Sequence, residues 1–164
     1  RSRAVADTAE VVAEARVAAA PPVRTVTVAS ERFGSFEVPE DTIFELDPGL
    51  VGFPNERRFV VMESRPGSPF KWMLCVDEPD LAFAVVDPVE FVPGYRAPIE
   101  KAVEVLGCAP GDVALFVFFF NATATAEIYA NLLAPVVVDL ARRVGRQLVL
   151  EDPTLDPAHP IPLL

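Results

Sequence analysis

Short segments in which apolar and polar residues alternate dominate the chain after residue 24. TVTVAS at 25–30 and FGSFEV at 33–38 alternate as half-buried strands do. RFVVME at 58–63 and FKWMLCV at 70–76 flank an RPGS turn, which predicts a hairpin. Other strands are expected at 41–46, 81–86, 89–92, 113–120 (fully buried), 129–139 and 146–151. Short strands separated by turns predict a mainly β fold, a small antiparallel β-barrel-like domain with one short helix.

The pattern changes to a helical period at 98–106. Ile99, Ala102, Val103 and Leu106 occupy positions i, i+3, i+4 and i+7, which places them on one face of a helix. Pro98 suits the first turn, and Gly107 suits the position just after the last one. The sequence therefore predicts one helix that begins near Pro98 and ends at Leu106.

The two ends of the chain differ from the middle. Residues 1–24 are rich in alanine and contain Pro21-Pro22, so we expect a mobile extension. Residues 25–152 are expected to form the barrel domain. Residues 153–164 include Pro153, Pro157, Pro160 and Pro162, and they are expected to be an irregular tail.

The charge of the chain limits the kinds of partner that it can bind. The net charge is −10 and the isoelectric point is near 4.5, which argues against direct binding of nucleic acid, because that binding neutralises phosphates with Lys and Arg. Residues 77–112 contain eight acidic side chains and two basic ones. Such a surface would attract a basic protein. Solubility alone is the alternative explanation, and it stays open.

Composition also indicates the cellular compartment of the protein. The longest apolar run, at 113–120, is far below the roughly 20 residues that a membrane span needs, so no membrane association is expected. The first residues lack the apolar core of a signal peptide, since Asp7, Glu10 and Glu14 interrupt it. Cys75 and Cys108 both lie in apolar surroundings and are expected to be free thiols. A cytoplasmic protein, monomeric when free, is the expectation.

The segment SPFKWMLCVDEPDLAFAVVDP at 68–88 holds the best candidate site. Its two strands each end in an acidic turn, with Asp77, Glu78 and Asp80 in the first and Asp87 in the second. These carboxylates could serve acid–base catalysis or present charge to a partner. Asp80 and Asp87 stand at opposite ends of one strand, roughly 20 Å apart at about 3.3 Å per residue, which is too far for a catalytic pair.

Other routes to an enzyme have little support. His159 is the only histidine and lies in the Pro-rich tail, so we expect no catalytic residue, no metal site and no cofactor. A carboxylate-dependent hydrolase stays open as an alternative, as does an acidic barrel that binds an unrelated partner. Aromatic residues beside the turns could either plug the barrel ends or anchor a partner: Phe33, Phe53, Phe91 and Tyr95.

Four blocks in order resemble the FliW family of flagellar assembly factors: GLVGFPNERRFVVME (49–63), SPFKWMLCVDEPDLAFAVVDP (68–88), NLLAPVVVD (131–139) and GRQLVLED (145–152). The resemblance spans about 26–152, and it implies a small β-barrel-like protein that is not an enzyme. Proteins of this family bind the flagellin monomer. They also bind CsrA, an RNA-binding repressor of flagellin translation, and prevent it from acting.

Charge and position then suggest which residues of this chain would meet a partner. Asp77, Glu78, Asp80 and Asp87 are the expected contact charges. Phe83 and Phe91, beside those turns, are the expected apolar anchors.

Overall fold

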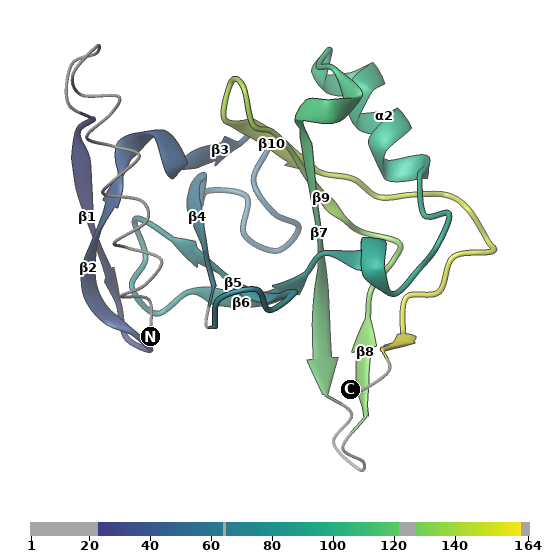
Figure 1. Ribbon diagram of the computed structural model, residues 1–164, viewed down its shortest axis with the longest axis horizontal. Coiled ribbons are helices and arrows are strands. Elements are labelled where there is room, and N and C mark those ends of the chain that lie inside the picture. The colour runs from purple at the N-terminus through teal and green to yellow at the C-terminus, as the bar shows by residue number, and fades with distance from the viewer. Residues whose placement is uncertain (1–22, 64, 122–126, 162–164) are drawn as a thin grey trace.

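A computed structural model describes residues 23–63, 65–121 and 127–161 (Figure 1). The extension predicted at 1–24 therefore lies almost wholly outside the described residues, as does most of the link at 121–126. None of the helices in these ranges has the length and apolar character that crossing a membrane requires.

Seven strands close into a barrel within the described part of the chain. Hydrogen-bonded neighbours follow the order β3, β4, β5, β6, β7, β9 and β10, and β10 pairs with β3 to complete the circle (Figure 1). Closure leaves these strands few free edges. The mainly β, barrel-like prediction is confirmed. The strands are β3 (Phe44–Leu46), β4 (Arg58–Glu63), β5 (Phe70–Cys75), β6 (Ala82–Val86), β7 (Val113–Asn121), β9 (Val136–Asp139) and β10 (Val144–Gln147).

The remaining elements cover the outside of the barrel. A hairpin of β1 (Thr25–Ser30) and β2 (Gly34–Pro39) lies on one side, and helix α2 (Ala97–Leu106) lies on the other (Figure 1). The far end of β7 pairs with β8 (Ile128–Ala130), which in turn pairs with β11 (His159–Ile161).

Alternation along the strands sorts the apolar side chains into an inner core and two outer ones. In β6, Phe83 and Val85 point into the barrel, where they meet Phe59 and Met73. Ala82 points outward and packs with Val28 beneath the hairpin. Strands β4, β5 and β6 therefore each contribute side chains to two apolar layers, the interior of the barrel and the core beneath the hairpin.

Strand β7 serves the other outer core in the same manner. Leu115 and Val117 point outward and pack against Ala102 of α2, whereas Phe116 and Phe118 point into the barrel. The prediction of a fully buried strand at 113–120 is therefore wrong, because its inner and outer faces alternate and Phe120 is 47% exposed.

Helix α2 forms where its apolar period predicts it. Pro98 lies in the first turn, and Ala102 is fully buried against the barrel. Gly107 ends the helix with a φ of 69°, and its N–H donates to the Val103 carbonyl (3.0 Å). A side chain is strained at such a φ, so glycine suits this position.

Two strand predictions fail where a side chain or a proline favours a turn. Residues 89–92 do not extend the sheet, because Pro88 begins the 3₁₀ helix η2 (Pro88–Glu90) and the Asp87 carboxylate accepts from the Val89 N–H (3.0 Å). Residues 41–46 are strand only in β3, because the 3₁₀ helix η1 (Glu40–Thr42) precedes it.

Four further differences concern the second half of the chain. The strand expected at 146–151 is found at 144–147, as β10. The strand expected at 129–139 is broken at 131–135, where the Asn131 side chain accepts from the Leu133 N–H (3.0 Å). The tail expected to be irregular forms β11, since Ala130 and its neighbours offer it a strand edge. The barrel is not wholly antiparallel, because β10 pairs with β3 in parallel.

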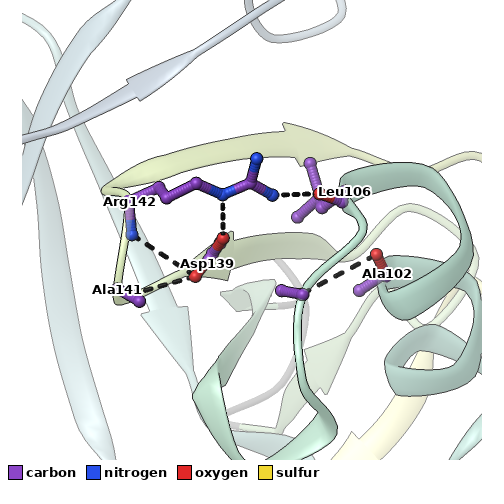
Figure 2. Close-up of polar contacts among 6 residues, drawn as sticks. Ala102, Leu106, Asp139, Ala141 and Arg142 are labelled. Carbon is purple, nitrogen blue, oxygen red and sulfur yellow. Dashed lines mark hydrogen bonds and ion pairs between the residues drawn. The ribbon is translucent and has the colours of Figure 1, made fainter.

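One polar cluster joins helix α2 to the barrel (Figure 2). The buried Asp139 carboxylate, at the end of β9, accepts from the Ala141 N–H (3.0 Å) and from Arg142 Nε (2.7 Å). The same guanidinium donates to the carbonyl of Leu106, the last residue of α2. This contact places a cation at the negative end of the helix dipole. Arg142 thus links the β9–β10 turn to the end of α2.

We expect Asp139→Asn to lower the melting temperature at pH 7. The hydrogen bond from Arg142 is the main cause that lowers the pKa of Asp139 below its usual 3.8. A lowered folded-state pKa stabilises the protein above the unfolded-state value, and this contribution is lost as the pH falls through the folded-state value. The difference in melting temperature between the two proteins should therefore shrink below about pH 4. A constant difference down to pH 2 would contradict this account.

We expect Gly145→Ala to lower the free energy of unfolding by about 1–3 kcal/mol, because it would overpack the barrel. A Cβ at Gly145 would lie 2.5 Å from the Val137 carbonyl oxygen and 3.1 Å from Leu46 Cδ2. Gly111→Ala is the matched control, since nothing lies within 4 Å of its Cβ position. Urea denaturation should separate the two variants; equal stabilities would contradict the packing argument.

Candidate protein-binding site

The first acidic turn, at 77–80, joins β5 to β6 and touches the outer hairpin. The Leu81 N–H donates to the Glu78 carbonyl (3.1 Å), which closes the turn. The Glu31 N–H, in the β1–β2 turn, donates to the Pro79 carbonyl (2.8 Å). Two connections far apart in the sequence therefore hold this acidic turn in place.

Asp77 is not a free charge. Arg58, the first residue of β4, donates to both carboxylate oxygens, from Nη2 to Oδ1 at 2.7 Å and from Nε to Oδ2 at 3.1 Å. This hydrogen-bonded pairing lowers the pKa of Asp77. No pattern in the sequence points to Arg58 as the partner of Asp77, because the pairing depends on the register of β4 against β5. Glu78 and Asp80 are exposed and form no ion pair with the described residues.

Asp87 lies at the other end of β6 from Asp80, in accord with the spacing argument. Its carboxylate is half-buried and caps η2 through the Val89 N–H. The structure therefore gives Asp87 a local role, and it separates this residue from the turn at 77–80.

The two aromatic anchors expected from the sequence lie in different cores. Phe83 is half-buried inside the barrel, with ring centroids 5.3 Å from Phe53 and 5.5 Å from Phe118. Phe91 packs in the outer core beneath helix α2, with its ring centroid 6.0 Å from that of Phe70. Tyr95 is a core residue, 5% exposed, and its hydroxyl donates to the Leu132 carbonyl. Of the two expected anchors, Phe83 borders the open groove described next.

An apolar groove of about 590 Å³ opens at one end of the barrel. Val51 and Val149 stand at its rim with 70% and 68% of their surface exposed. Gln147 supports the rim, since its side chain accepts from the Val51 N–H (2.8 Å) and donates to the Ala134 carbonyl (3.1 Å). The lining residues are Leu50, Val51, Ala82, Phe83, Ala84, Phe118, Phe119, Asn131, Ala134, Gln147 and Val149.

The groove has no signature in the amino-acid sequence. Its residues come from five separate segments, and each apolar residue taken alone fits an ordinary core position. In the structure, Val51 and Val149 mark the groove, because these two large apolar side chains line it and remain exposed.

The chemistry of these surfaces suits binding better than catalysis. Among the residues that the structure describes, no ionisable side chain lines the groove. Burial raises the pKa of the Cys75 thiol, which disfavours the nucleophilic thiolate. His159 lies half-buried in β11. Across the described ranges, no group of three or more His, Cys, Asp or Glu side chains could hold a metal ion.

A closed barrel with an apolar groove and a neighbouring acidic turn has the features of a protein-binding module. Comparison with known proteins gives the family. The family model described as FliW protein matches residues 27–161. The chain therefore belongs to the FliW family of flagellar assembly factors.

Individual proteins of the FliW family are similar to this chain over most of its length. The flagellar assembly factor FliW of Syntrophotalea carbinolica is 36% identical over 133 residues, which are 80% of this chain and 94% of that protein. The FliW of Bdellovibrio bacteriovorus is 32% identical over 136 residues, 82% of this chain and 78% of its own. A crystal structure of the flagellar assembly factor FliW superposes with a TM-score of 0.72 at 28% identity, covering 84% of this chain and 99% of that one.

We expect Asp77→Asn to lower the free energy of unfolding by less than about 1 kcal/mol, because solvent screens a half-exposed ion pair. The Arg58 and Asp77 side chains are 47% and 53% exposed. Chemical denaturation of the variant measures this. A loss well above that value would mean that the pair orders the turn, and binding defects of Asp77 variants could then not be attributed to lost charge.

Proposed function

We propose that this chain binds the flagellin monomer and, by protein–protein binding, antagonises the translational repressor CsrA. Membership of the FliW family across residues 27–161 is the observation that carries the proposal. The role is non-catalytic and cytoplasmic, it needs no cofactor, and it involves no direct contact with nucleic acid. We infer that the free protein is a monomer.

The charge of the chain supports the same proposal. The net charge is −10, and an RNA-binding repressor must carry basic surface to hold phosphates. Glu78 and Asp80 are exposed and have no ion-pair partner among the described residues, so they are free to pair with a basic protein. An acidic protein bound to the repressor would also repel incoming RNA. We propose Glu78 and Asp80 as the main charged contacts with the partner, and we propose Asp77 and Asp87 as weaker contacts.

Asp77 and Asp87 are ranked lower for a physical reason. Arg58 already compensates Asp77, and Asp87 is half-buried at the start of η2. Desolvating a carboxylate that has an internal partner brings less new interaction energy to a complex. Phe91 is ranked below Phe83 as an anchor, since it packs in the outer core against Phe70.

We expect calorimetry with purified CsrA to detect a complex at low salt that weakens as salt rises, because the Debye length falls from about 10 Å at 0.1 M to about 3 Å at 1 M. The double variant Glu78→Lys/Asp80→Lys should weaken that complex about tenfold or more at low salt. Glu100→Lys/Asp112→Lys is the matched control, because it makes the same charge change at two exposed positions, one in the first turn of α2 and one shortly after its end.

Two results would count against the proposal. If neither CsrA nor flagellin binds at low salt, the proposed function is wrong. If both double variants weaken binding equally, net charge rather than the turn at 77–80 governs association, and the assignment of Glu78 and Asp80 fails.

A further inference from the structure

Strands β6 and β7 separate along their length, and the groove lies where they part. Their pairing is confined to Val85 with Phe118 and Val86 with Val117. The first half of β6 pairs only with β5 in the described structure, and the last residues of β7 pair with β8 on the opposite side. Figure 1 shows the far end of β7 running away from β5 and β6. The barrel wall therefore has a gap beside Ala82–Ala84.

The backbone of β6 faces this gap with free hydrogen-bonding capacity. The Cys75 N–H donates to the Leu81 carbonyl (3.2 Å), so Leu81 and every second residue after it turn their backbone groups toward β5. Ala82 and Ala84 consequently turn theirs toward the gap. Within the described ranges no strand pairs with Ala82, Phe83 or Ala84 on that side. An exposed edge of this kind accepts an added strand.

Side chains at the gap favour an apolar occupant. The groove of about 590 Å³ beside Ala82–Ala84 has Phe83 and Phe118 among its lining residues, with the exposed Val51 and Val149 at its rim. Neither valine is covered by the described residues. An occupant whose apolar side chains lie in this groove would cover both of them.

Acidic residues stand next to two of the lining segments along the chain. Within the described part of the chain no charged residue lines the groove, but the exposed Asp80 lies two residues before Ala82 in the sequence, and the exposed Glu151 lies two residues after Val149. The chain as a whole carries a net charge of −10. A segment with basic residues beside its apolar centre is complementary to this arrangement.

We propose that this gap binds an extended segment of a protein partner, apolar at its centre and basic at its flanks, as an added strand along Ala82–Ala84. The inference rests on the proposed function, because it names the site and the kind of segment through which a partner would be held. The groove and the turn at 77–80 then form one surface. The groove provides apolar contact, and Glu78 and Asp80 provide charge.

Val51 and Val149 provide the test, because their exposure allows substitution without disturbing the core. Val51→Lys, Val51→Asp, Val149→Lys and Val149→Asp are titrated into flagellin monomer and, separately, into CsrA, both from the same organism. We expect all four to weaken binding of at least one of these partners about tenfold or more. If the Asp variants lose affinity for the partner as well as the Lys variants, then apolar contact at these positions contributes to binding. A surface that acts by charge alone would bind a basic partner more tightly after the Asp changes.

Val89→Lys and Leu140→Lys are the matched controls. These residues are 58% and 59% exposed and do not line the groove, so their variants should bind as the wild type does. If the wild type binds and the groove variants bind equally well, this inference is wrong while the proposed function stands. If the wild type binds neither partner, both are wrong. A wild-type dimer in sedimentation that Val149→Lys dissociates would assign the groove to a second copy and overturn the proposal.

Strand addition has its own signature. Ala84→Pro removes an N–H that faces the gap and leaves the β5–β6 ladder intact, so it should weaken the complex while the melting temperature changes little. Amide hydrogen exchange at Ala82 and Ala84 should slow on complex formation. Unchanged exchange at both amides in a complex that the valine variants abolish would show that the segment binds without forming a strand.

Discussion

Closure of the barrel through β10 is the constraint on which the rest of the structure depends. This strand pairs in parallel with β3 and antiparallel with β9, and Gly145 lies where the Val137 carbonyl and Leu46 leave no room for a Cβ. The Asp47 N–H donates to the Gly145 carbonyl (3.2 Å), and the Val51 N–H to the Gln147 side chain (2.8 Å). The close approach at Gly145 thus also places one rim of the groove.

Closure of the barrel also explains why its two outer covers differ, one being a β-hairpin and the other a helix. A barrel strand alternates its side chains, so each wall needs its own cover on the outside. The β1–β2 hairpin covers β4–β6, whereas α2 covers β7 and β9 and is linked to the β9–β10 turn by Arg142. The β5–β6 connection emerges next to the hairpin, and its Pro79 carbonyl accepts from Glu31. Acidic turn and groove are therefore neighbours, since both adjoin the first residues of β6.

Local signals predicted much of the fold and little of the candidate site. The structure confirms the strands predicted at 25–30 and 58–63 and the end of the helix at Gly107. Both kinds of prediction depend only on residues close together in the sequence: the alternation of apolar and polar residues, and a glycine directly after a helical period. Prediction failed at 89–92, where Pro88 and the Asp87 cap outweigh β propensity. It also failed at 159–161, where a proline-containing segment becomes a strand because β8 offers it an edge. The groove was missed because no local pattern marks where two strands part.

By itself, the sequence determined most of the strand segments, where α2 ends, the excess of acidic residues and the resemblance to the FliW family. Only the tertiary structure decided which carboxylates are compensated and where the barrel wall opens. Asp77 meets Arg58 across 19 positions, and Val51 meets Gln147 across 96. Such contacts depend on strand register and barrel closure, which arise from the packing of the whole chain rather than from any single segment.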